Sequence, residues 1–143
     1  QWRSSAASDV YKRQGINISY KNDGKNKYLI YGIENRIEQI IANLLDNAIS
    51  FSDDNKDVIV QVSKSEDNKV YIKILDEGQG FKEKDTNKIF KRFYSNRPDK
   101  FGQHSGLGLN IVKNLVDLHN ATIKATNRED KKGASMEIEF PKV

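Results

Sequence analysis

The sequence contains no cysteine, and this absence excludes a disulfide framework, thiol catalysis and cysteine-based zinc sites. Only two histidines are present, so a histidine-rich metal site is not expected. No apolar run approaches the roughly 20 residues that a membrane-spanning helix needs. The net charge of +4 suits a small phosphate-bearing ligand. The basic residues are scattered among acidic ones, which argues against a nucleic-acid-binding surface.

The first 14 residues differ from the rest of the chain. They show neither strand alternation nor a helical stripe, and they lack the apolar centre of a secretory signal. Two interpretations stand: a translated adapter scar of the kind found at the ends of assembled environmental sequences, or a genuine but disordered terminus. Neither gives residues 1–14 a function. We therefore assign one compact domain to residues 15–143, a length that fits a single hydrophobic core.

Apolar periodicity predicts the elements of this domain. Alternation with a period of two predicts strands at 16–20, 28–31, 58–62, 70–74, 121–127 and 134–140. Helical periodicity predicts helices at 34–52, 85–94 and 106–119. Polar segments predict turns at 22–24 and 66–68 and a loop at 95–105. The order predicts an α/β two-layer sandwich, in which helices cover one face of a mixed, mostly antiparallel sheet.

The first long helix carries two asparagines at the edge of its apolar stripe. Asn43 and Asn47 are i, i+4 neighbours, so their amides project from one face at the core boundary. An amide oxygen is a neutral, hard ligand that suits Mg²⁺. Two ordinary solvated asparagines also fit this pattern, so the pair does not identify a site by itself.

Asp76 has the strand parity of the apolar residues at 70–74, which directs its carboxylate to the core face of the sheet. A carboxylate there needs a hydrogen-bond donor, and the exocyclic amine of a purine would supply one. Gly78 and Gly80 allow a sharp turn and the close approach of a flat ring. An ordinary strand-ending turn is the alternative interpretation of this segment.

The run Gly106-Leu107-Gly108-Leu109 opens the second long helix. Free N–H groups and the helix dipole favour a phosphate at such a position. The run lacks the ending of a Walker loop and is not a dinucleotide fingerprint. The length and polarity of residues 95–105 suit a mobile lid. This loop offers four further phosphate donors: Arg97, Lys100, His104 and Ser105.

Four runs occur in a specific order: N-L-L-D-N-A at 43–48, D-E-G-Q-G at 76–80, I-F-K-R-F at 89–93 and G-L-G-L at 106–109. Together they resemble the catalytic and ATP-binding domain of bacterial sensor histidine kinases, within the GHKL ATPase superfamily. The resemblance covers about residues 15–143. The stretch 92–109 looks most like the ChvG/ExoS group of alphaproteobacterial sensor kinases. The resemblance implies the Bergerat ATP-binding fold with about three helices, and ATP and Mg²⁺ as cofactors.

The resemblance also implies roles for the first two runs. Asn47 corresponds to the asparagine that coordinates the Mg²⁺ bridging the ATP phosphates, and Asn43 to an asparagine near this metal. Asp76 corresponds to the aspartate that accepts a hydrogen bond from the adenine amino group. Gly78 and Gly80 correspond to glycines that let the backbone fit round the base.

For the later runs, Phe90 and Phe93 correspond to the residues that anchor the lid. Gly106 and Gly108 correspond to the glycines at the phosphate-side helix start, with Leu107 and Leu109 beside them. Gly133 corresponds to a further glycine turn. His119 is interpreted as a structural residue at a helix end, whereas for His104 a phosphate contact and simple exposure both stay open.

The implied activity is that of a protein histidine kinase, which donates the γ-phosphoryl group of ATP to a histidine on a separate dimerisation hairpin. Nothing in the sequence resembles that hairpin, so the chain is predicted to be the kinase module without it. The expected partners are this hairpin and a downstream response regulator. The expected location is the cytoplasmic part of an inner-membrane sensor kinase, with no direct membrane contact from this segment.

The chain departs from the family pattern at Ser50 and Ser95, where lysine and arginine are common near the phosphates. Arg97 or Lys100 could supply the lost charge. A nucleotide-binding module without transfer activity therefore stays an alternative. A conformational ATPase of the Hsp90, gyrase or MutL type is disfavoured, because those proteins carry a glutamate at the position of Asn43 and an amide cannot act as a base.

Overall fold

The computed structural model describes residues 17–22, 27–52, 56–82, 86–91 and 108–143. Its strands are β1 (Asn17–Lys21), β2 (Asp57–Lys64), β3 (Val70–Leu75), β4 (Thr122–Asn127) and β5 (Ala134–Phe140). Its helices are α2 (Glu34–Phe51), the short 3₁₀ helix η1 (Thr86–Phe90) and α3 (Gly108–Leu118). These bounds agree closely with the predicted elements except in the segment before α2.

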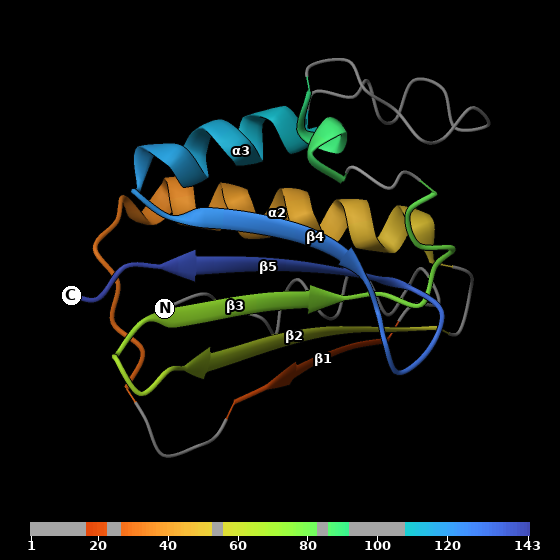
Figure 1. Cartoon of the computed structure of the whole chain (residues 1–143), viewed down its shortest axis with the longest axis horizontal. Helices are drawn as coiled ribbons and strands as arrows, with labels where there is room; N and C mark the ends of the chain where they lie inside the picture. Colours follow the sequence, from red (N-terminus) through yellow and green to blue (C-terminus); the bar gives the residue numbers. More distant parts are fainter. Residues whose placement is uncertain (1–16, 23–26, 53–55, 83–85, 92–107) are drawn as a thin grey trace.

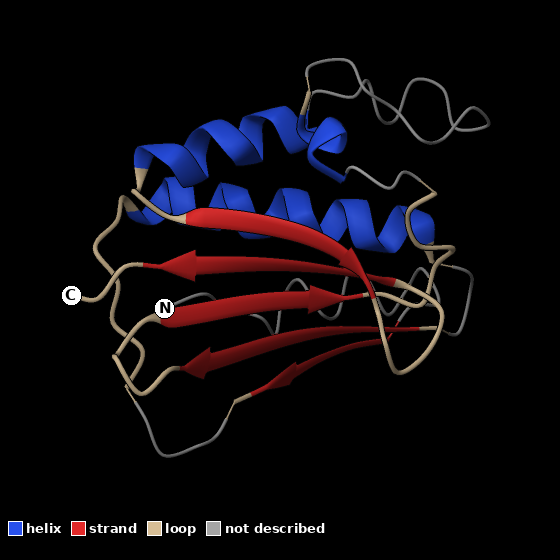
Figure 2. Ribbon diagram, in the orientation of Figure 1, coloured by secondary structure: helices blue, strands red, loops and turns tan. Residues whose placement is uncertain are grey.

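The five strands form one sheet in the order β1-β2-β3-β5-β4. β1 pairs with β2 in parallel, and all other neighbours are antiparallel, so the sheet is mixed as predicted. Both long helices lie on one face of this sheet (Figure 2). The fold is therefore the predicted two-layer α/β sandwich.

The core lies between the sheet and the two helices. Each element buries the side that its periodicity predicts, since alternate residues of β3 and one stripe of α2 are inaccessible. In β5, Met136, Ile138 and Phe140 face the helices, while Glu137 and Glu139 face away. Burial of these apolar side chains is the main favourable term in folding. No helix in the described part of the chain is long and apolar enough to span a membrane.

The predicted strand at 28–31 is wrong. Tyr28 and Ile30 pack against the core while Leu29 and Tyr31 are exposed, so the alternation itself is real. The segment nevertheless joins no strand, because it runs from the sheet up to the start of α2 (Figure 1). Alternation reports that one side of an extended segment is buried, whereas a strand also needs a hydrogen-bonded neighbour.

Candidate functional site

Asp76 is a buried carboxylate directly after β3. Its side chain is on the core side as predicted, and the residue is only 2% exposed. Oδ1 accepts hydrogen bonds from the backbone N–H groups of Gly78, at 2.9 Å, and Ala134, at 3.0 Å. The backbone N–H of Asp76 in turn donates to the Ala134 carbonyl at 3.0 Å. These bonds hold the carboxylate in one orientation and offset part of the cost of its burial.

The glycines around Asp76 are required by the fold itself. A Cβ at Gly78 would lie 2.6 Å from the carbonyl oxygen of Phe51, the last residue of α2. A Cβ at Gly133 would lie 2.0 Å from the Asp76 carbonyl oxygen, and its φ of +147° favours glycine as well. A Cβ at Gly80 would lie 2.6 Å from the Asn127 side-chain oxygen. The sharp turn predicted for Gly78 and Gly80 thus has a packing reason, and the approach of a flat ring to them stays a prediction.

Asn43 and Asn47 lie half-buried beside the buried stripe of α2, as predicted. Asn47 is about one helical turn before Phe51, whose carbonyl packs against Gly78. The Asn47 face of α2 and the loop after Asp76 therefore meet at the same end of the helix.

The residues at this end fit a magnesium–nucleotide complex better than a metal held by protein alone. No cluster of three or more His, Cys, Asp or Glu side chains able to hold a metal occurs in the described ranges. Mg²⁺ commonly takes only one or two protein oxygens and completes its shell with phosphate oxygens and water. The amide oxygen of Asn47 suits such a shell.

The start of α3 is joined to η1 near the same end. Asn110, in the first turn of α3, donates through its Nδ2 to the Phe90 carbonyl at 3.2 Å. Phe90 belongs to the buried core, and Leu109 is partly buried against this core. No described atom lies within 4 Å of a Cβ built at Gly108, so packing against the described residues does not require this glycine.

The described candidate residues thus gather at one end of the molecule, where α2 and β3 end and α3 begins (Figure 1). The other candidates lie outside the described residues, and their roles stay predictions: Phe93, Arg97, Lys100, His104, Ser105, Gly106 and Leu107. Ser95 lies there too. Ser50 is described, and its hydroxyl donates to the Asn47 carbonyl at 2.9 Å.

Arg128, which sequence reasoning missed, reaches Asp76 from the loop between β4 and β5. Its Nη1 donates to the Asp76 carbonyl oxygen at 3.1 Å. Its Nε and Nη2 donate to the two carboxylate oxygens of Asp130, at 2.9 and 2.7 Å. This pairing lowers the pKa of Asp130 to about 2 and raises that of Arg128. The charged sequence at 128–132 could not reveal this contact, because no local pattern indicates which carbonyl the guanidinium binds.

Glu77 was also missed, and it joins three parts of the chain. Its Oε2 accepts from the backbone N–H of Asp57 at 2.9 Å, and its Oε1 accepts from Lys131 Nζ at 3.1 Å. These bonds, that from Asp57 foremost, hold the pKa of Glu77 below its usual value. The residue after Asp76 is thereby tied to the start of β2 and to the β4–β5 loop.

His119 has the structural role predicted for it. Its Nδ1 lies 2.7 Å from the Leu115 carbonyl, and its Nε2 accepts the Ile33 N–H at 3.1 Å. This pattern assigns the neutral tautomer with the proton on Nδ1. His119 therefore joins the end of α3 to the residue before α2, at the opposite end of the helices from Asp76 (Figure 1).

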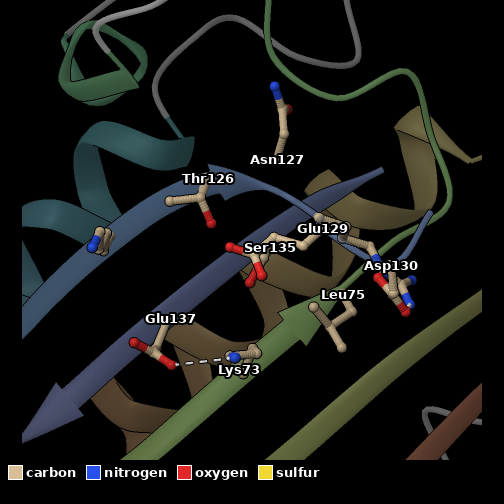
Figure 3. A pocket seen from close by; sticks show the side chains of 10 residues that line it. Lys73, Leu75, Thr126, Asn127, Glu129, Asp130, Ser135 and Glu137 are labelled. Atoms are coloured by element: carbon tan, nitrogen blue, oxygen red, sulfur yellow. Dashed lines mark hydrogen bonds and ion pairs between the residues drawn. The ribbon is translucent and has the colours of Figure 1, made fainter. Parts of the chain in front are cut away.

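A cavity of about 500 Å³ lies on the face of the sheet that the helices leave open (Figure 3). Lys73 and Glu137, which form an ion pair at 3.5 Å, and Thr126 are among the residues that line it. None of the residues predicted from the sequence lines this cavity, but Arg128 and Asp130 do, so it adjoins the loop that contacts Asp76.

Comparison with known proteins agrees with the family resemblance seen in the sequence. The family described as "Histidine kinase-, DNA gyrase B-, and HSP90-like ATPase" matches residues 32–143. The sensor protein ChvG of Agrobacterium fabrum is 36% identical over 129 residues, which cover 85% of this chain and 22% of that protein. The chain thus spans about a fifth of the length of this relative.

Solved structures agree in fold. The catalytic domain of histidine kinase ThkA superposes with a TM-score of 0.78 at 26% identity, covering 94% of this chain and 84% of the other. Full-length ShkA in complex with AMPPNP superposes with a TM-score of 0.80 at 24% identity, and the match covers 96% of this chain and 28% of ShkA. ThkA in complex with the response regulator protein TrrA superposes with a TM-score of 0.75 at 24% identity. The match covers 94% of this chain and 36% of the ThkA chain.

Proposed function

The chain belongs to the family of histidine kinase-, DNA gyrase B- and HSP90-like ATPases, as the ATP-binding catalytic domain of a two-component sensor histidine kinase, and we propose that it phosphorylates a histidine on a separate dimerisation hairpin. The observation that carries this proposal is Asp76, a buried and oriented carboxylate beside the asparagine-bearing face of α2. A hydrogen-bond acceptor fixed in this way suits the amino group of adenine.

The proposed site divides the nucleotide between two groups of residues. Asp76 binds the base, while Asn47, with Asn43 nearby, holds the Mg²⁺ whose charge offsets that of the phosphates. The phosphates would bind the first N–H groups of α3 and the polar groups that the sequence offers at 97–106. The family match and the complex of ShkA with AMPPNP support ATP as the ligand.

In the proposed transfer, a ring nitrogen of the acceptor histidine attacks the γ-phosphorus, the new N–P bond forms, and the bond to the β–γ bridging oxygen breaks to release ADP. A neutral imidazole carries the lone pair for this attack, so the domain needs no strong base. Its contribution is orientation of the phosphates and stabilisation of their charge. This agrees with an amide, rather than a carboxylate, at Asn43.

Phosphoryl transfer to a supplied hairpin tests this proposal. The chain would be mixed with γ-labelled ATP, Mg²⁺ and the separately expressed hairpin of the ChvG relative, and labelling of the hairpin followed. We expect labelling that needs the hairpin histidine and is lost in Asn47→Ala. The matched control is Asn114→Ala, the same change at an exposed position of α3.

Two outcomes separate the alternatives. Tight ATP binding without any transfer, with several acceptor hairpins, would favour a nucleotide-binding module, in keeping with the departures at Ser50 and Ser95. Hydrolysis by the isolated chain at about 1 per second or faster would favour a conformational ATPase, because that rate is ordinary for an enzyme with an activated water.

The partners and location of the whole protein are part of the same proposal. The complex of ThkA with TrrA supports a response regulator as the downstream partner. The similarity to the sensor protein ChvG supports a place on the cytoplasmic side of an inner-membrane sensor kinase. The acceptor hairpin would lie in the same full-length kinase.

A further inference from the structure

Arg128 is a buried cation with a fixed direction. Its side chain is only 4% exposed, whereas that of Asp130 is 63% exposed. Asp130 occupies the Nε and Nη2 edge of the guanidinium with both of its carboxylate oxygens. Because the guanidinium is planar, this bidentate pair also fixes where Nη1 points. Nη1 then donates to the Asp76 carbonyl oxygen at 3.1 Å.

Arg128 in the β4–β5 loop and Ala134 at the start of β5 therefore hold the main chain of Asp76 on both sides of its Cα. The Asp76 N–H donates to the Ala134 carbonyl, and the Asp76 carbonyl accepts from Arg128 Nη1. The Cα of Gly133 packs so closely against the same carbonyl oxygen that no side chain fits between them. The direction of the carboxylate follows from these restraints, since its Oδ1 accepts from the N–H of Ala134, the first residue of β5.

We propose that Arg128 is a positioning residue, which acts through the Asp76 main chain to aim the carboxylate and so determines the preference for purines that carry a 6-amino group. This inference rests on the proposed role of Asp76. Loss of Arg128 would leave the Asp76 peptide free to tilt, and the hydrogen bond to the base would lose its geometry. Contacts to the phosphates, at the start of α3, would be unaffected.

A comparison of two nucleotides tests the inference. ATP carries the 6-amino group, and purine riboside triphosphate has hydrogen in its place. Affinities would be measured by displacement of fluorescent trinitrophenyl-ATP for the wild type, Arg128→Met and Arg128→Lys. We expect ATP to bind about tenfold more weakly to Arg128→Met, the scale of one charge-assisted hydrogen bond, and purine riboside triphosphate to bind as to the wild type.

Lysine should not restore the wild-type affinity, because a single ammonium group cannot bind Asp130 bidentately and also reach the Asp76 carbonyl. Asp130→Asn provides a variant that keeps the arginine if Arg128→Met fails to fold, and it should weaken ATP binding in the same selective way. Lys73→Gln is the matched control, since it breaks an ion pair on the open face of the sheet without contacting Asp76.

The outcomes distinguish this inference from the proposed function. Equal weakening of both nucleotides in Arg128→Met and Asp130→Asn would mean general damage to the loop and would overturn the inference. Unchanged ATP affinity in these variants, together with weaker binding in Asp76→Asn, would overturn it while leaving the role of Asp76 intact. Unchanged ATP affinity in Asp76→Asn would remove the proposed base contact itself.

Discussion

The glycines near the candidate site differ in whether a Cβ at their position would collide with other protein atoms. Gly78 and Gly133 are required by packing, because a methyl group at either position would collide with a backbone oxygen. Gly108 has no such neighbour among the described residues. At a helix start, glycine fits the predicted contact with a phosphate that approaches the backbone closely.

Gly108→Ala should therefore separate stability from binding. We expect the free energy of unfolding to stay the same or to rise by up to about 1 kcal/mol, since alanine is the better helix former. ATP affinity should fall by about 1 kcal/mol or more, because the methyl group obstructs a phosphate at the helix N–H groups. Urea unfolding and calorimetric titration with ATP measure the two effects.

Gly133→Ala is the contrasting variant, and it should lose about 2 kcal/mol or more of stability through the clash with the Asp76 carbonyl and the strained backbone. A Gly108→Ala protein that binds ATP like the wild type would contradict a phosphate contact at this position.

Asp76→Asn should weaken ATP binding without unfolding the protein. An asparagine Oδ1 can accept the same two bonds from Gly78 and Ala134, so the loop keeps its structure. The charge that strengthens the bond to the adenine amine is lost, which costs about 1–3 kcal/mol of binding free energy. Calorimetric titration checks this result, with the exposed Asp117→Asn as control. Equal affinities of Asp76→Asn and the wild type would refute the assignment.

At the scale of elements, α3 ends in a Schellman motif. Ala121 N–H donates to the Val116 carbonyl at 3.1 Å, and Asn120 N–H donates to the Asp117 carbonyl at 3.0 Å. Asn120 has a φ of +56°, a conformation that glycine adopts freely and asparagine tolerates. Asn120 thus closes the helix at the position where this motif usually has glycine.

Replacements at Asn120 should change stability in opposite directions. Asn120→Ala should lose about 1 kcal/mol, because alanine has neither the freedom of glycine nor the local hydrogen bonding of asparagine at positive φ. Asn120→Gly should be neutral or stabilising by up to about 1 kcal/mol. Thermal unfolding of both variants gives the comparison. Asn114→Ala, within α3, is the control and should be slightly stabilising; a loss as large as at Asn120 would point to a general effect.

At the scale of the whole molecule, the site is assembled from segments that are distant in the sequence. Asp76 after β3 is held by Arg128 of the β4–β5 loop and by Ala134 of β5, and Gly78 packs on the end of α2. Glu77 adds the start of β2 through the Asp57 N–H and Lys131 through an ion pair. The carboxylate of Glu77 therefore couples the geometry around Asp76 to the stability of the fold.

This coupling predicts a dependence of stability on acid pH. The folded state holds the pKa of Glu77 below its usual 4.5, so the stabilisation is complete above that pH and is lost as the pH falls through the lowered pKa. Glu77→Gln lacks this ionisation. We expect the variant to be less stable than the wild type at pH 7 and the difference to shrink steadily below about pH 4.5.

Urea unfolding over a pH series measures this difference. The exposed Glu66→Gln in the β2–β3 turn serves as control. A difference between Glu77→Gln and the wild type that is constant from pH 7 to pH 3 would show that Glu77 stabilises the fold through packing rather than through its charge.

The sequence by itself determined the helices, all five strands of the sheet to within two residues, and the side of the sheet on which Asp76 lies. These features follow from burial of one side of an element, which leaves a period in the residues that compose it. The order of runs at 43–48, 76–80, 89–93 and 106–109 likewise indicated the family, and the match over residues 32–143 confirms it.

Only the tertiary structure decided which segments meet. The parallel pairing of β1 with β2, the unpaired segment before α2, and the contact of Arg128 with the Asp76 carbonyl all join residues that no local pattern relates. Periodicity records that a side chain is buried and not what it touches. The partner depends on how the chain closes on itself, and for that reason the carboxylate was predictable from the sequence while the arginine that holds it was not.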